Sequence, residues 1–205
     1  MTVVAASLSL LLHVLPPYRP LIHRVRSAES IALVEITRQT RQQLAFDPKM
    51  SLHGEALKSA RIQPGHKPSA KARFGLATFR RIAGRWYLQD QAREWIELEP
   101  SAWRAHPPSV WRRWVTRLRK ESIPTLLRSL GRAPFDQFAA RDLNALMLAP
   151  DRADLRKSVA QRLAQPGVAP RIAESLRHTL LRSSPPAERA LLKRCLLGDK
   201  ACVGR

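Results

Sequence analysis

Tryptophan and arginine alternate in one stretch of this 205-residue sequence. All five tryptophans fall there, at Trp86, Trp95, Trp103, Trp111 and Trp114. Aromatic rings interleaved with guanidinium groups suit the bases and phosphates of single-stranded nucleic acid. Tryptophan and arginine are also enriched at protein interface hot spots, and tryptophans are common anchors of a hydrophobic core. The pattern favours the core role and leaves both binding roles open.

Residues 110–120 separate apolar from basic side chains most clearly. Trp111, Trp114 and Leu118 share one side of a predicted helix, and five basic residues occupy the other side. Such a basic side could contact phosphate, lipid headgroups or an acidic protein. The candidate partner-binding residues are Trp86, Trp95, Trp111, Arg112, Arg113, Trp114, Arg117, Arg119 and Lys120.

Other reactive residue types form no catalytic or metal-binding pattern. No glycine is followed by Lys-Ser or Lys-Thr, and the six histidines fit no metal-ligand spacing. Asp151 and Asp154 are better placed to begin a helix than to share a proton. Cys195 and Cys202 could close only a small disulfide loop, so we expect a reduced, cytoplasmic protein. We therefore expect a non-enzymatic protein without a cofactor or metal.

The charge balance restricts the partners. Lys and Arg number 36 against 16 Asp and Glu, which gives a formal charge of +20. A field of this size attracts polyanions, with a strong dependence on salt. The chain is 44% hydrophobic, enough to bury a core, so the charge does not indicate a disordered basic tail.

The periodic segments predict an all-α, irregular multi-helix bundle. Helical spacing recurs after residue 69, and proline or glycine ends most of the segments. We expect a helix over residues 27–44, although alternation at Ile31, Leu33 and Ile36 leaves a short strand open. We expect further helices over residues 51–62, 76–96, 110–120, 122–130, 136–149, 151–163, 172–180 and 184–197.

Two features near the N-terminus divide the chain. Residues 3–15 form an apolar run without a basic start or a cleavage site, which predicts a packed helix instead of a secretion signal. The run is also too short to cross a bilayer. Residues 63–68 read as a turn-rich connector. The predicted organisation is an N-terminal helical segment with its connector, residues 1–68, and a helical bundle domain, residues 69–205.

Two short stretches carry a resemblance to a known family. Residues 51–62 read SLHGEALKSARI, and residues 83–96 read AGRWYLQDQAREWI. In these stretches, in size and in helical content, the chain resembles the small cytoplasmic sorting-platform adaptors of bacterial type III secretion, which include a rhizobial nodulation protein. The resemblance implies a protein-transport adaptor that is peripheral to the membrane and binds other subunits of the secretion apparatus, and the positive charge of the chain implies that these subunits are acidic. It implies no particular functional residues.

Two functions are therefore expected from the sequence. The first is a helical adaptor of a secretion assembly, as the resemblance implies. The alternative is a basic nucleic-acid-binding or regulatory protein, as the charge implies.

Overall fold

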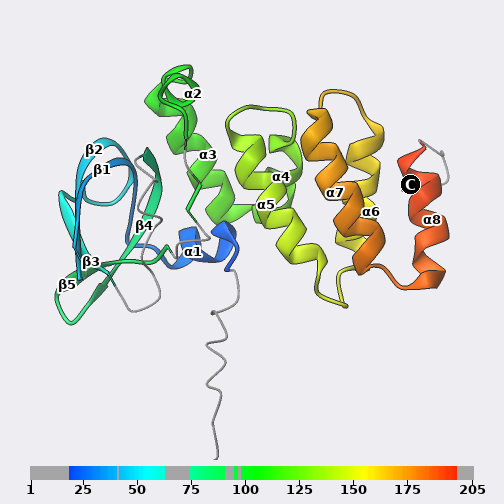
Figure 1. Ribbon diagram of the computed structural model, residues 1–205, viewed down its shortest axis with the longest axis horizontal. Helices are drawn as coiled ribbons and strands as arrows, with labels where there is room; N and C mark the ends of the chain where they lie inside the picture. The colour runs from blue at the N-terminus through cyan, green and yellow to red at the C-terminus, as the bar shows by residue number, and fades with distance from the viewer. Residues whose placement is uncertain (1–18, 41, 63–73, 91–94, 97, 198–205) are drawn as a thin grey trace, which may run out of the picture.

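A β-barrel and a row of helices lie side by side in the computed structural model (Figure 1). The structure describes residues 19–40, 42–62, 74–90, 95–96 and 98–197. The expected all-α bundle is wrong, because five strands form a closed barrel and the chain is a mixed α/β protein. The description as a helical bundle applies only to the second half of the chain.

The barrel has the strand order β1-β2-β3-β5-β4, with β4 returning to β1. Neighbouring strands are antiparallel except for β3 and β5, which are parallel. This topology is that of the OB-fold, a five-stranded Greek-key barrel. The strands are β1 (Ser30–Gln39), β2 (Gln43–His53), β3 (Ser59–Ile62), β4 (Phe74–Ile82) and β5 (Arg85–Leu88).

Strand β1 is buried on both faces. Ala32 and Val34 point into the barrel, whereas Ile31 and Leu33 join the core that the barrel shares with the helices. Such a strand reads as a continuous apolar run and resembles a buried helix in sequence. The helix expected over residues 27–44 is therefore wrong, and the strand left open there is confirmed.

Strand β4 shows the same two-sided burial. Leu76 packs in the core shared with the helices and Phe79 packs inside the barrel. The three-residue spacing that predicted a helix over residues 76–96 thus comes from side chains on opposite faces of a strand. Ala83 and Gly84 both have positive φ and join β4 to β5 by a two-residue turn.

The helices after residue 108 confirm the predicted segments in that part of the chain. Proline precedes or opens α3, α7 and α8, where its fixed φ suits a helix start. The helices are α1 (Leu21–Ser27), α2 (Pro100–Arg104), α3 (Pro108–Lys120), α4 (Ser122–Ser129), α5 (Phe135–Met147), α6 (Ala153–Ala164), α7 (Pro170–Ser183) and α8 (Pro186–Leu196).

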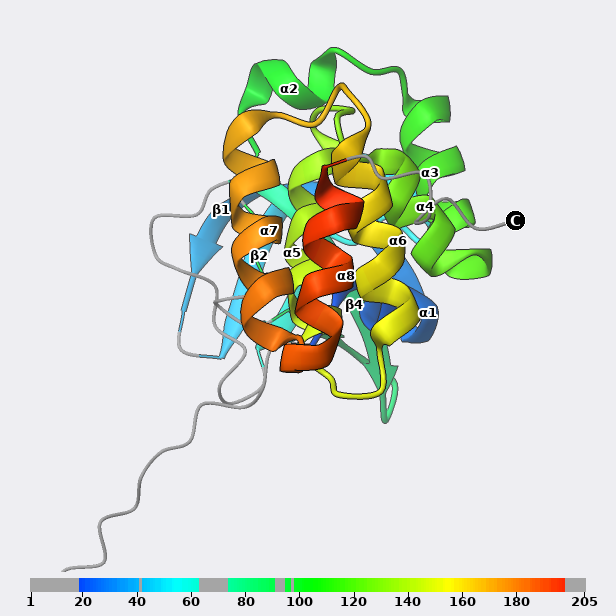
Figure 2. The ribbon, with the colours of Figure 1, turned by 90° about the vertical axis from the view of Figure 1, so that its right-hand side faces the viewer.

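Helices α4 and α5 form one pair, α6 and α7 form the next, and α8 packs against α6. Helix α6 contacts α4 and α8, and α5 contacts α7, so alternate helices form two layers. Figure 2 looks along this row from its α8 end. The loops of successive pairs touch: the guanidinium of Arg162 donates to the carbonyl oxygens of Leu130, at 2.7 Å, and Pro166, at 3.2 Å. The arrangement resembles an α-solenoid, in which each pair buries its apolar face on the next.

The predicted two-part organisation places its boundary at the connector, residues 63–68, and these residues lie outside the described part of the chain. The apolar run at residues 3–15 lies outside it as well. Strands β1 to β3 precede this connector, strands β4 and β5 follow it, and all five pair in one barrel.

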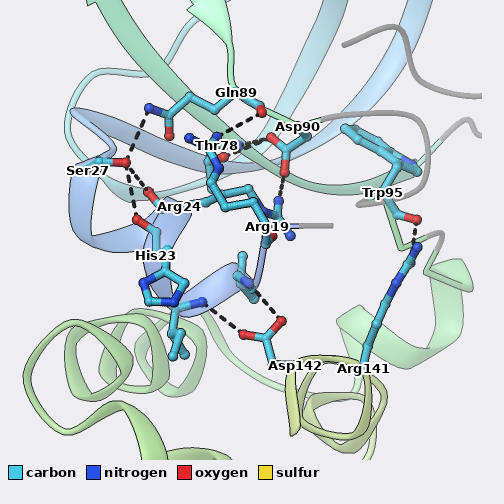
Figure 3. A network of polar contacts seen from close by, with 12 residues as sticks. Arg19, His23, Arg24, Ser27, Thr78, Gln89, Asp90, Trp95, Arg141 and Asp142 are labelled. Carbon is cyan, nitrogen blue, oxygen red and sulfur yellow. Dashed lines mark hydrogen bonds and ion pairs between the residues drawn. The ribbon is translucent and has the colours of Figure 1, made fainter. Parts of the chain in front are cut away.

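Helix α1 fastens the barrel to the helices (Figure 3). The carboxylate of Asp142 on α5 accepts hydrogen bonds from the backbone N–H groups of Leu21, at 2.7 Å, and Ile22, at 2.9 Å. At the other side of α1, Arg24 forms a buried ion pair with Asp90, the second residue after β5. Arg141 on α5 donates to the carbonyl oxygen of Trp95 at 3.0 Å. The two parts are thus joined by polar contacts as well as by a common core.

Candidate functional site

The first candidate surface is a row of outward-facing side chains across the barrel. Arg61 on β3 pairs in register with Tyr87 on β5, and Tyr87 pairs with Arg80 on β4. Directly opposite residues on neighbouring strands present their side chains on the same face. Arg61 and Arg80 are exposed and Tyr87 is half-buried, whereas the next residue of β5, Leu88, is buried inside the barrel. One aromatic ring therefore lies between two arginines on an open sheet surface.

The β4–β5 hairpin extends this surface beyond the barrel. Ile82 and Arg85 are opposite one another in the register, and both are exposed, Ile82 at 40%. On the other face of the hairpin the guanidinium of Arg81 lies over the Trp86 ring, 5.6 Å from its centroid. We call Arg61, Arg80, Ile82, Arg85 and Tyr87 the hairpin surface.

Two acidic side chains of the barrel, Glu35 and Asp47, form ion pairs on the β1–β2 ribbon. Lys49 forms ion pairs with Glu35 at 2.8 Å and Asp47 at 2.6 Å. Hydrogen bonds to Asp47 and then to Glu35 raise the pKa of Lys49. None of the residues of the hairpin surface is acidic.

The second candidate surface is a pocket of about 420 Å³ beside helices α3 and α4. Two aromatic side chains in its lining are almost fully buried, Trp114 at 7% exposed and Phe135 at 6%, and the polar Thr125 and Ser129 beside them are buried as well. Val110 lines it from the start of α3. Five basic residues surround this apolar floor, namely His106, Arg113, Arg117, Arg128 and Arg132. We call it the arginine pocket.

The floor of the arginine pocket is fixed by ring packing and hydrogen bonds. The Phe135 ring centroid lies 4.6 Å from that of Trp111 and 4.8 Å from that of Trp114. The Trp114 indole N–H donates to the Ser129 hydroxyl at 2.9 Å, and that hydroxyl donates to the carbonyl oxygen of Thr125 at 2.7 Å. The indole N–H therefore already has an acceptor within the fold.

The structure separates the partner-binding residues predicted from the sequence. Arg113, Trp114 and Arg117 come together in the arginine pocket. Trp111 is fully buried in the core shared by the two parts of the chain. Lys120, at the end of α3, is exposed.

Two of the predicted arginines contact the barrel side. Arg112 donates to the carbonyl oxygen of Ser51 on β2, and Arg119 donates to that of Ala28 after α1, both at 3.1 Å. These two side chains position α3 against the barrel, so the basic side of α3 has two different roles.

The remaining two predicted tryptophans belong to the barrel. Trp86 is half-buried on β5, beneath Arg81. Trp95 is buried and packs against Gly75, where a Cβ would come within 2.7 Å of its ring. Glycine at position 75 is therefore what admits the Trp95 ring.

Reasoning from the sequence missed the arrangement of Arg61, Arg80 and Tyr87, and it missed His106, Arg128 and Arg132. One signal pointed to the first group: residues 80–88 read RRIAGRWYL, in which the two residues Ala-Gly stand between short alternating segments, as in a β-hairpin. No local pattern links α4 to α3.

Comparison with protein-family models, curated proteins and solved structures finds no match for this chain. The resemblance to type III secretion adaptors therefore stays a prediction. Among the residues that the structure describes, no three His, Cys, Asp or Glu side chains gather as metal ligands. None of the described helices combines the length and the apolar character needed to cross a lipid bilayer.

Proposed function

We propose that this protein binds single-stranded nucleic acid on the hairpin surface of its barrel. The observation that carries the proposal is the register that places Tyr87 between Arg61 and Arg80. The role is binding, and no reaction is assigned to it.

The chemistry of the hairpin surface supports this function. A base stacked on an aromatic side chain contributes about 1–3 kcal/mol and needs no particular sequence. Arg61 and Arg80 flank the Tyr87 ring, so a strand stacked there has a guanidinium on either side for its phosphates. Arg85 and Ile82 extend the contact along the hairpin.

The fold and the charge support the proposal independently. OB-fold barrels bind oligonucleotides on strands β2 and β3 and on the β1–β2 and β4–β5 loops. That is analogy at the level of the fold, and a fold alone does not define a function. The formal charge of +20 supplies the long-range attraction to a polyanion.

A single strand fits this surface better than a duplex does. The ring at its centre belongs to a strand within a sheet, and an unpaired base can lie on such a ring. Bases in a duplex are stacked on each other and reach an aromatic side chain only after they are unstacked.

The test is the salt dependence of binding to a labelled 12-nucleotide oligothymidine, measured by fluorescence anisotropy. Each phosphate contact to a single strand contributes about −0.7 to the slope of log K against log salt. We expect R80A/R85A to weaken binding and to make the slope less steep by about 1.4. The control R171A/R177A removes two exposed arginines from α7, with the same change in net charge. Equal slopes for the two double variants would reject the hairpin surface as the binding site.

A further inference from the structure

We infer that the arginine pocket binds an acidic segment of a partner protein that inserts one bulky apolar side chain. The pocket is formed by residues of α3 and α4, by the first residue of α5 and by the loops around them, and it shares no residue with the hairpin surface. The inference therefore adds a second binding site to the one proposed above.

The rim of the pocket is a double row of arginines. Arg113 and Arg117 are four residues apart on α3, which places them on one side of that helix about 6 Å apart along its axis. Arg128 on α4 and Arg132 just after it form the second row. All four are exposed. Planar guanidinium groups bind carboxylates by paired hydrogen bonds, so this rim is complementary to several acidic side chains.

One contact within the fold already shows this chemistry. Arg128 forms an ion pair with Glu121 at 2.7 Å, and the positive charge of Arg117 also acts on Glu121. The hydrogen bond from Arg128, and then its charge, lower the pKa of the Glu121 carboxyl. Both side chains are more than half exposed, so a partner's carboxylate can reach Arg128 from solvent.

The apolar floor of the pocket is the reason for proposing that the partner inserts an apolar side chain. Val110, Trp114 and Phe135 line a volume of about 420 Å³, in which a leucine or phenylalanine side chain can leave water. An apolar floor within a polar rim is the usual plan of a protein interface anchor site.

The same floor argues against a nucleobase as the occupant. Trp114 and Phe135 are almost fully buried, and their rings pack on Trp111 and Phe138. Both rings are therefore less accessible to a stacked base than the half-buried Tyr87 ring is. The Trp114 N–H and the Ser129 hydroxyl bond to each other, so they do not face outward to read the edge of a base.

The experiment uses the full chain and a labelled 12-residue peptide of Asp and Glu with one central Phe. A second peptide carries Ala in place of Phe. We expect the Phe peptide to bind at low salt and the Ala peptide to bind at least fivefold more weakly. Against the Phe peptide we expect R113E/R117E to lose at least tenfold in affinity. R171E/R177E, with the same change of charge on α7, should lose less than threefold.

A second variant tests the floor without changing the charge. Val110 is half-buried at the pocket wall, so V110W should fill the apolar volume and leave all four arginines in place. We expect it to reduce affinity for the Phe peptide to that of the Ala peptide, with an unchanged circular dichroism spectrum. If V110W alters the fold, comparison of the two peptides on the unmodified chain still tests the floor.

Three results would overturn the inference. The first is equal affinity for the two peptides, and the second is equal loss of affinity in the two charge-reversal variants. The third is displacement of the peptide by oligothymidine, together with a greater loss of oligothymidine binding in R113E/R117E than in R171E/R177E. The last result would assign the pocket to nucleic acid. R80A/R85A should leave peptide affinity within threefold of the unmodified chain, so failure of this inference and failure of the proposed function are distinguishable.

Discussion

Arg24 and Asp90 form an ion pair that is buried where α1 meets the end of the barrel, with their side chains 2% and 0% exposed. Asp90 also accepts hydrogen bonds from the backbone N–H of Thr78, at 2.6 Å, and from its hydroxyl, at 2.9 Å. One carboxylate thus holds β4, the end of β5 and α1 together (Figure 3). In the sequence Asp90 resembles a helix cap. In the structure it pairs with Arg24, which lies 66 positions earlier in the chain.

The first prediction concerns this ion pair. Removal of either partner breaks a buried ion pair, so we expect D90A and R24M each to lower the free energy of unfolding by about 3–5 kcal/mol. The double variant R24M/D90A should lose clearly less than the sum of the two single losses, because each single variant already removes the same ion pair. Urea unfolding of the four proteins measures this coupling. Strictly additive losses would mean that the two charges do not interact.

The second prediction concerns two glycines with positive φ. Gly84 has φ +77°, and a Cβ there would meet no atom within 4 Å. Gly131 has φ +84°, and a Cβ there would overlap the carbonyl group of Gly167 in the loop of the next helix pair. We expect G84A to cost about 1–2 kcal/mol for the backbone conformation alone. G131A should cost a further 1–3 kcal/mol or so, because the two loops must separate.

Thermal or urea unfolding of these two variants tests whether the helix pairs stack through their loops. Equal losses for G84A and G131A would contradict the contact between the α4–α5 and α6–α7 loops.

The third prediction concerns the protonation of His53. Partial burial and then the nearby positive charge of Arg119 lower its pKa from the ordinary value of 6.5. The unfolded chain therefore takes up this proton at a higher pH than the folded chain. The contribution of His53 to stability is present above pH 6.5 and is lost as the pH falls through the folded-state pKa.

An NMR titration of the His53 ring measures that pKa directly. We expect a midpoint below 6.5 and a higher midpoint in R119Q, since that variant removes the positive charge. A midpoint at or above 6.5 in the unmodified protein would contradict a net lowering of the His53 pKa by burial and Arg119.

The helices could be predicted from the sequence because their burial is one-sided. In α3, Trp111, Trp114, Val115 and Leu118 are buried and the residues between them are largely exposed, which gives an unambiguous helical period. Proline and glycine between the helices mark where each one ends.

The barrel could not be predicted in the same way, because β1 and β4 are covered on both faces and lose the alternation of a half-buried strand. Their pairing is also distant in sequence: Ile31 lies opposite Thr78. The candidate sites depend on such distant pairings. Tyr87 meets Arg61 only through the parallel contact of β3 and β5, and Arg128 approaches Arg113 only once α4 has packed on α3.

The most direct test of the proposed function is photocrosslinking of the full chain to an oligothymidine that contains 5-iodouracil, followed by mass spectrometry of the crosslinked peptides. If a base stacks on the hairpin surface, the crosslink maps to residues 85–88 and is lost in Y87A, whereas the control Y87F retains it because the ring remains. Crosslinks confined to residues 100–197, or an undiminished yield in Y87A, would contradict binding on the barrel.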